Sequence, residues 1–238
     1  EIGSGLVGSE MCIRDRAQRL SETELEQFSR KIRIYYVLSC FEEKYMDSCF
    51  ATISSGILAG AVKGLRYDAD AKMGKDQVTV NLPVRVNWGG GWSDTPPYCM
   101  EHGGTVLNAA VMLDGNCPIE VVVKKVDEPV IVLASADSGA EQTFTDISSL
   151  QDSSNPYDPF ALHKAALIAC GVIPYKEPVS VQEITKNLGS GLYLSTQVIN
   201  IPRGSGLGTS SILAGACVKA LYEILGKEVT DEELYDRA

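Results

Sequence analysis

Residues 199–211 read Ile199-Asn200-Ile201-Pro202-Arg203-Gly204-Ser205-Gly206-Leu207-Gly208-Thr209-Ser210-Ser211. An apolar segment gives way to alternating glycines and then to hydroxyl side chains. After this stretch the apolar residues recur at helical spacing, at Ile212, Leu213, Ala216, Cys217, Ala220, Leu221, Ile224 and Leu225. This spacing predicts an amphipathic helix that stops at Gly226. An expected strand, Leu192 to Ile199, comes before the glycines, so the order is strand, glycine loop, helix.

The glycine loop is interpreted as a phosphate-binding site. Gly204, Gly206 and Gly208 tolerate a positive φ and carry no Cβ, so consecutive backbone N–H groups can point at one phosphate. The positive end of the helix faces the loop, where Thr209 and Ser210 can cap free N–H groups, contact phosphate oxygens or bind a magnesium ion. No Gly-Lys-Ser/Thr follows, so this is not a Walker loop. The loop alone leaves open a tight turn before a well-capped helix.

The tetrapeptide Gly-Ser-Gly-Leu occurs twice more, at residues 3–6 and 189–192. The first copy follows no expected strand, and the second leads into a strand instead of a helix. Only the copy at 204–207 has the strand, loop and helix that a phosphate site needs. We therefore predict that the other two copies do not bind phosphate.

The composition is that of an ordinary globular protein. Of 238 residues, 45% are hydrophobic and 22% are charged, which is enough to bury a core. A net charge of -10 and a pI near 4.7 disfavour a nucleic-acid partner. The seven cysteines show no C-x-x-C spacing, so neither a zinc site nor a disulfide framework is indicated. No apolar run suggests a membrane span or signal peptide, and we expect a cytoplasmic protein without a membrane partner.

Three segments are expected along the chain. Residues 1–16 look like a non-native, adapter-like extension and are excluded from the fold. Residues 17–76 are expected to form a helical segment and linker, and residues 77–238 a folded domain. Thr230 begins a capping box for a helix that we expect to continue beyond Ala238.

Two helices are predicted in the first part of the chain. A second capping box, Ser21 to Glu24, begins a helix with apolar residues at helical spacing as far as Leu38. Another helix is expected from about Phe41 to Lys63. Together they predict a helical hairpin that packs on the folded domain, with residues 66–76 as the linker.

From Val78 the apolar period changes to two. The expected strands are residues 78–87 with Pro83 at an edge or bulge, 105–112, a hairpin of 117–126 with 129–134 around Asp127-Glu128, and 142–147. Asp158 is expected to be the N-cap of a helix that has Pro159 at its first position and ends at Gly171. This order predicts an α+β fold.

Between the first two expected strands lies a loop rich in glycine and proline. Polar side chains in such loops often bind ligands, and His102 lies in this loop. His163 falls on an alanine-rich helix, where a structural role is the more common one.

The two glycine segments together resemble the GHMP kinases, and within that superfamily the L-fucose kinases. Pro202-x-Gly-Ser-Gly-Leu-Gly-Thr-Ser-Ser211 is similar to the ATP loop, and Arg85-Val-Asn-Trp-Gly-Gly-Gly-Trp-Ser-Asp94 stands where the sugar-binding motif belongs. The resemblance covers about residues 78–238. It implies the N-terminal domain of a GHMP kinase, a ribosomal S5 domain 2-like fold, preceded by the helical hairpin.

The resemblance also implies roles for single residues. Arg85 would lie near the transferred phosphoryl group, and Asp94 would accept hydrogen bonds from sugar hydroxyls, with Trp92 and Ser93 beside it. Gly204, Ser205, Gly206, Leu207, Gly208, Thr209 and Ser210 would form the triphosphate loop for ATP, with Ser210 reaching Mg²⁺. The structural alternatives are a surface strand residue for Arg85 and a turn cap for Asp94.

Other family features lie outside the sequence. The family's catalytic aspartate and third glycine motif are expected beyond Ala238, so the chain alone is expected to be inactive. A nucleotidyltransferase fused upstream would fit the bifunctional members. The implied activity is transfer of the ATP γ-phosphoryl group to the anomeric hydroxyl of L-fucose. A heptose-phosphate or other sugar kinase, or a non-catalytic sugar and ATP sensor, remain as alternatives.

Overall fold

The computed structural model describes residues 28–95, 98–155, 157–202 and 204–238. Residues 1–16, the capping box at 21–24 and Arg203 therefore lie outside the described residues. The chain divides into two compact units, Glu1–Gly64 and Leu65–Ala238. No helix in the described ranges is long and apolar enough to cross a membrane.

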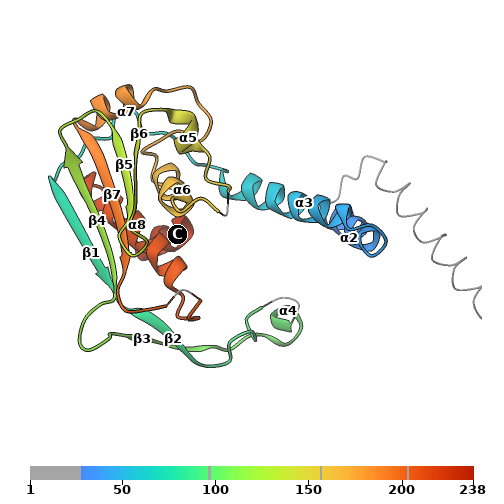
Figure 1. Cartoon of the computed structure of the whole chain (residues 1–238). Coiled ribbons are helices and arrows are strands. Elements are labelled where there is room, and N and C mark those ends of the chain that lie inside the picture. Colours follow the sequence, from blue (N-terminus) through green and yellow to red (C-terminus); the bar gives the residue numbers. More distant parts are fainter. Residues whose placement is uncertain (1–27, 96–97, 156, 203) are drawn as a thin grey trace, which may run out of the picture. The chain divides into compact units, whose positions relative to one another are not determined.

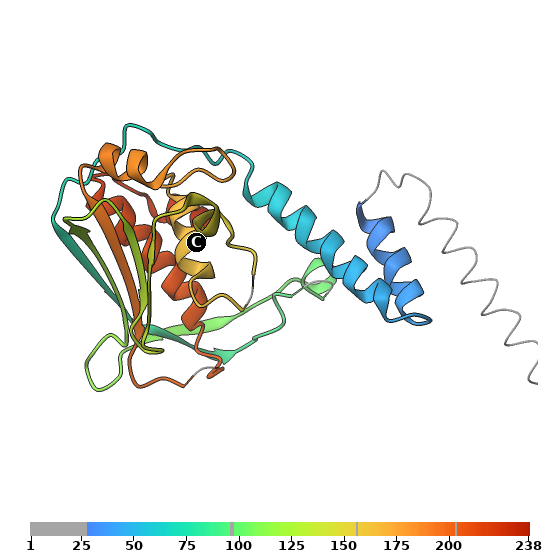
Figure 2. The same ribbon diagram turned by 45° about the horizontal axis from the view of Figure 1, so that its top comes forward.

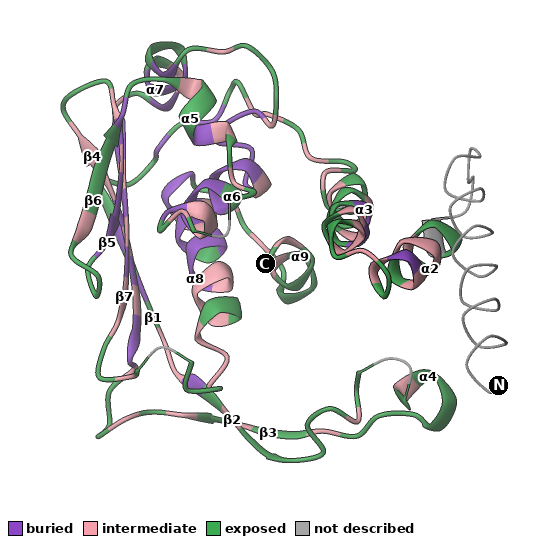
Figure 3. Ribbon diagram, turned by 45° about the vertical axis from the view of Figure 1, so that its right-hand side comes forward, coloured by how far each residue is buried: buried purple, intermediate pink, exposed green. Residues whose placement is uncertain are grey.

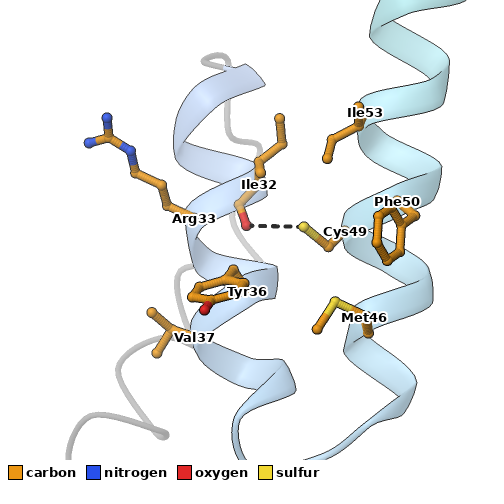
Figure 4. A pocket seen from close by; sticks show the side chains of 8 residues that line it. All are labelled: Ile32, Arg33, Tyr36, Val37, Met46, Cys49, Phe50 and Ile53. Atoms are coloured by element: carbon orange, nitrogen blue, oxygen red, sulfur yellow. Dashed lines mark hydrogen bonds between the residues drawn. The ribbon is translucent and has the colours of Figure 1, made fainter. Parts of the chain in front are cut away.

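The described part of the first unit is a helical hairpin, as predicted. Helix α2 (Phe28–Ser39) packs along α3 (Lys44–Ala61). Apolar side chains of both helices line a groove between them, and Cys49 Sγ lies 3.7 Å from the Ile32 carbonyl oxygen (Figure 4). None of the residues predicted for the ATP or sugar site belongs to this unit.

The second unit contains two sheets. Five strands form one sheet in the order β1-β4-β7-β5-β6. Their bounds are Gln77–Leu82 for β1, Ile119–Val126 for β4, Gly191–Val198 for β7, Ile131–Ser135 for β5 and Ala140–Phe144 for β6. All neighbours are antiparallel except β5 and β7, which are parallel. A separate antiparallel ribbon pairs β2 (Val84–Gly89) with β3 (Leu107–Val111).

The core lies between one face of the five-stranded sheet and two helices, α8 (Thr209–Ile224) and α6 (Ala161–Ala169) (Figures 1 and 2). Burial alternates along β4, where Ile119, Val121 and Val123 are fully buried and the residues between them are half-buried. This is the period of two that a sheet covered on one face requires. The buried residues gather between the sheet and α8 (Figure 3), which places the glycine loop at the exposed end of a well-packed helix.

Pro83 divides the strand that was predicted over residues 78–87. The β1 ladder with β4 ends at Leu82, and the chain continues from Val84 in the β2–β3 ribbon. Proline has no amide hydrogen to donate to a ladder, which accounts for the break. The predicted edge position is confirmed for β1, but the single strand was wrong. The second expected strand, 105–112, is β3.

The predicted hairpin of residues 117–126 with 129–134 was also wrong. The two strands exist, as β4 and β5, but β7 lies between them and pairs with both. The expected strand at 142–147 is β6, displaced toward the N-terminus. The expected strand at 192–199 is confirmed as β7, within one residue at each end.

For the helices, one predicted N-cap was wrong and three elements were not predicted. The N-cap of α6 is Phe160, and Asp158 instead accepts a hydrogen bond from the Phe160 amide at 2.8 Å. Three helices were not predicted: α4 (Tyr98–His102), α5 (Ile147–Gln151) and α7 (Val181–Leu188). The capping box at Thr230 is confirmed and begins α9 (Asp231–Arg237).

Candidate active site

The glycine loop leads from β7 directly into α8, in the context that the sequence predicted. Gly204, Gly206 and Gly208 have φ values of 76°, 75° and 69°, in the left-handed region that favours glycine. Gly208 is the N-cap of α8, so no side chain of that residue covers the first amide groups of the helix. Those amides carry the partial positive charge of the helix end and are suited to an anion.

Arg85 lies against this loop. Its backbone N–H donates to the Leu207 carbonyl at 3.2 Å. A Cβ placed on Gly208 would stand 3.4 Å from Arg85 Nε and 3.7 Å from Cζ, so the guanidinium lies beside the start of α8. The structure therefore brings the predicted phosphoryl residue to the predicted phosphate loop.

The hydroxyl residues of the loop differ in exposure. Thr209, the first residue of α8, is half-buried, whereas Ser205 and Ser210 are exposed. In the described ranges no three His, Cys, Asp or Glu side chains group closely enough to hold a metal ion.

Trp92, Ser93 and Asp94 lie at the other end of the β2–β3 ribbon. Trp92 is 84% exposed with a φ of 75°, and Asp94 is exposed. Strand β2 continues for four residues beyond Arg85, about 13 Å at ~3.3 Å per residue. The structure therefore does not place these three residues beside the glycine loop. Figure 1 shows the ribbon running from α8 to the α4 loop.

Ser93 is engaged within its own loop. Its hydroxyl lies 2.6 Å from the Gly90 carbonyl oxygen and 2.9 Å from that of Thr105, and it accepts from the Thr105 amide at 3.1 Å. These contacts join the two arms of the loop between β2 and β3.

A cavity of about 930 Å³ adjoins the entrance to the glycine loop. Asn116, Glu120 and Asn200 contribute polar groups to its lining, and Met112 and Ile199 contribute apolar ones. Ile199 and Asn200 directly precede the loop, and Asn200 has a φ of 60°. Such a mixture of polar and apolar lining is typical of small-molecule sites.

This cavity was not predicted from the sequence, although two signals for it were present. Asp114-Gly115, a common tight-turn pair, forms the turn that brings Leu113 to Asn116. Asn200 belongs to the same stretch, residues 199–211, as the glycine motif.

The two histidines lie in different environments. His163 is buried, with Nε2 2.9 Å from the Ala134 carbonyl oxygen and 3.1 Å from Thr196 Oγ1. Burial lowers the pKa of His163 below its ordinary value of 6.5. His102 is exposed in α4 and its ring contacts that of Tyr98. The position of His163 is that of a core residue.

Comparisons with known proteins show which families and proteins the chain is similar to. Residues 178–238 match the family described as GHMP kinases N terminal domain. L-fucokinase/L-fucose-1-P guanylyltransferase of Bacteroides fragilis is 40% identical over 195 residues, which are 80% of this chain and 20% of that protein. Bifunctional fucokinase/GDP-fucose pyrophosphorylase of Arabidopsis thaliana is 41% identical over 155 residues, 65% of this chain and 14% of that protein.

A solved structure, that of Methanococcus jannaschii mevalonate kinase, is similar over 68% of this chain and 44% of its own, with 17% identity and a TM-score of 0.49. The chain spans 20% and 14% of the lengths of the two fucokinase relatives. The sequence similarity includes the glycine loop and helix α8. The α+β class and the resemblance to the GHMP kinases are confirmed, and residues 178–238 match the N-terminal domain of that family.

Proposed function

We propose that the chain is part of an ATP-dependent sugar kinase that phosphorylates the anomeric hydroxyl of L-fucose. The observation that carries the proposal is the position of the Arg85 guanidinium beside Gly208, at the amide end of α8. A cation and a row of amides at one point suit a phosphoryl group in transfer. The choice of sugar is supported by the names of the two relatives, both of which include fucokinase.

In this proposal the loop amides of residues 204–210 hold the phosphates of ATP, and the Ser210 hydroxyl is a ligand of Mg²⁺. Bound ATP and magnesium would supply the phosphoryl group and neutralise part of its charge. Arg85 stabilises negative charge that grows on the phosphoryl oxygens, since its guanidinium offers several N–H donors in one plane. The cavity at Asn200 accepts the base and ribose, because it opens where the loop begins.

The sugar is assigned to the exposed end of the β2–β3 ribbon. Trp92 offers a free indole face for the apolar side of a sugar ring, and the Asp94 carboxylate accepts hydrogen bonds from hydroxyls. Because β2 separates this end from Arg85, transfer requires Trp92 and Asp94 to approach the phosphate loop when both substrates are bound. Closure of this kind is common in phosphoryl-transfer enzymes.

Much of the enzyme would lie outside this chain, since the relatives are several times longer. We propose that the carboxylate that receives the sugar hydroxyl proton lies in that remainder. A nucleotidyltransferase on the same polypeptide would match the bifunctional names of both relatives. The 238-residue chain alone is then expected to bind ATP without turning over.

The test is an initial-rate assay of the full-length protein with ATP, Mg²⁺ and a panel of sugars that includes L-fucose and a heptose phosphate. We expect ADP release that depends on L-fucose and yields the 1-phosphate, and none from the 238-residue chain. Turnover with the heptose phosphate alone would contradict the choice of sugar. Binding of ATP and L-fucose by the full-length protein without turnover would support a sensor and refute the kinase.

A further inference from the structure

We infer that Ser93 is a positioning residue: its hydroxyl closes the loop between β2 and β3 and thereby holds Trp92 and Asp94 as one preorganised pair. The inference rests on the proposed sugar site, and it changes the expected role of Ser93 from a sugar contact to a support for the two residues beside it.

The bonding capacity of the Ser93 hydroxyl is almost fully used within the loop. A serine hydroxyl has one proton and two lone pairs. The Ser93 hydroxyl donates its proton to the carbonyl of Gly90 or Thr105, at 2.6 and 2.9 Å, and one lone pair accepts the Thr105 amide. One lone pair remains and no proton. Ser93 could therefore donate to a sugar only by giving up a bond that closes the loop.

These bonds lie where the ladder between the two strands has ended. Gly90 directly follows β2, and Thr105 lies two residues before β3. The hydroxyl therefore bridges the two arms of the loop. The Ser93 amide adds a second bond to the Gly90 carbonyl, at 3.0 Å. Removal of the hydroxyl would therefore remove these contacts between the two arms.

The backbones of the two arms pack closely beside that bridge. A Cβ on Gly90 would stand 1.8 Å from the Thr105 carbonyl oxygen. A Cβ on Gly104 would stand 2.6 Å from the Ser93 carbonyl oxygen and 2.7 Å from Asp94 Cα. The backbones of the two arms are thus in direct contact, and only glycine fits at either position.

The loop also holds an unfavourable backbone conformation at Trp92. A φ of 75° is rare for a bulky residue and persists only where its surroundings impose it. Ser93, the next residue, is fixed through both its amide and its hydroxyl. The bridge therefore holds the backbone that carries Trp92 and Asp94 in one conformation, and a preorganised pair loses less entropy on binding a sugar.

The chain provides a matched control in Ser138. Its amide and hydroxyl both bind the carbonyl of Ser135, three residues earlier, as those of Ser93 bind Gly90. Ser138 lies in the turn between β5 and β6, and these two bonds stay within that turn, whereas Ser93 also reaches across its loop to Thr105. Ser138→Ala therefore removes a similar local bond away from the predicted sugar residues.

One test needs no substrate. Trp88 and Trp92 are the two tryptophans of the 238-residue sequence, so in this chain Trp88→Phe leaves Trp92 as the sole indole. In this background we expect Ser93→Ala to lower the fluorescence anisotropy of Trp92 and Ser93→Thr to restore it. Ser138→Ala should leave the anisotropy unchanged. Equal anisotropy in Ser93→Ala and Ser138→Ala would overturn the inference.

The kinetic test uses the full-length protein with L-fucose and its monodeoxy analogues. A hydrogen bond contributes about two- to tenfold in affinity, so the loss of the bridge in Ser93→Ala should raise KM for the sugar about tenfold. The KM for ATP and kcat should change less than about twofold. If Ser93 only positions its neighbours, every sugar loses the same factor. A deoxy analogue whose KM is the same in Ser93→Ala and in wild type would show that the Ser93 hydroxyl contacts the missing sugar hydroxyl directly. That result would overturn the inference.

Gly104→Ala gives an independent perturbation that leaves the hydroxyl in place. Its Cβ would push against the Ser93 carbonyl, so we expect the same rise in KM for all sugars and the same fall in Trp92 anisotropy. An unchanged KM and anisotropy in Gly104→Ala would count against the inference even if Ser93→Ala failed to fold. A wild type that is inactive on every sugar, with anisotropy altered as expected, would refute the proposed function while supporting the loop assignment.

Discussion

Replacement of Arg85 tests the assignment of the phosphate half of the site. The side chain is exposed, and the hydrogen bond that attaches its backbone to the glycine loop runs from the Arg85 amide to Leu207. That bond does not depend on the side chain, so Arg85→Ala should keep strand β2 on the loop. We expect the free energy of unfolding to change by less than about 0.5 kcal/mol, as for other exposed positions.

The expected effect on catalysis is much larger. A charged donor aimed at charge that develops in transfer contributes about 2.7–4 kcal/mol, or about 10²–10³ in kcat. The guanidinium stands within 4 Å of the Gly208 Cβ position, at the end of α8 to which we assign the phosphates. Arg85→Ala should therefore lower kcat about 10²- to 10³-fold. Arg85→Lys should recover only part of this, because an ammonium lacks the planar pair of donors.

The assay separates transfer from binding. Initial rates of the full-length protein are measured at saturating ATP and L-fucose, together with KM for each substrate and the melting temperature. Asp94→Asn is the comparison, since its carboxylate meets hydroxyls that are already present before transfer and its loss should mainly raise KM for the sugar. Arg66→Ala, another exposed arginine, is the control for loss of one positive charge.

Two results would refute the reasoning. A kcat unchanged in Arg85→Ala would remove the guanidinium from transfer, whatever happens to KM. A loss of kcat accompanied by a large fall in the melting temperature would instead indicate that the side chain stabilises the loop. Either result would remove the assigned role of Arg85 in phosphoryl transfer.

The remaining predictions concern the loop and the core. Gly206→Ala and Gly208→Ala should each cost about 1 kcal/mol of stability, because both glycines have a positive φ, and should also weaken ATP binding measured by calorimetry. An unchanged ATP affinity in both variants would mean that the loop is only a turn. Burial depresses the pKa of His163, so its stabilising neutral form is retained above pH ~6.5 and the protein loses stability as the pH falls below that value, by up to about 1.4 kcal/mol per unit. Denaturant unfolding at pH 7.5 and 5.5 should show a smaller loss of stability in His163→Gln than in wild type.

Local signals predicted the elements that form the phosphate site. The apolar period and Gly226 set the expected extent of α8, and the glycine spacing indicated the loop before it. Each of these features depends on residues within a few positions of one another. The same kind of signal was available for α7, where Ser180 caps the helix and Glu183 stands at its third position. That helix was predictable and was overlooked.

The strand order was not available from local signals. Strands β4 and β5 are separated by a short polar turn. Such a turn is typical of a hairpin, but it also occurs between two strands that are separated in the sheet by a third strand. The space is filled by β7, which runs parallel to β5. A parallel pair requires a long crossover, here containing β6 and helices α5 to α7. Period-two alternation does not identify which strand is the neighbour.

The position of Arg85 beside Gly208 depends on Pro83, two residues earlier in the chain. Val84 is buried, so alternation along β2 turns Arg85 to the opposite side, and this much the sequence implies. The surroundings of Arg85 on that side depend on Pro83. Because proline cannot donate to the β4 ladder, β1 ends at Leu82 and the chain leaves the sheet to form the ribbon that passes the start of α8. A residue without an amide hydrogen thus separates the strand that builds the core from the strand that carries Arg85. Neither the strand period nor the glycine motif predicts this separation of β2 from the sheet.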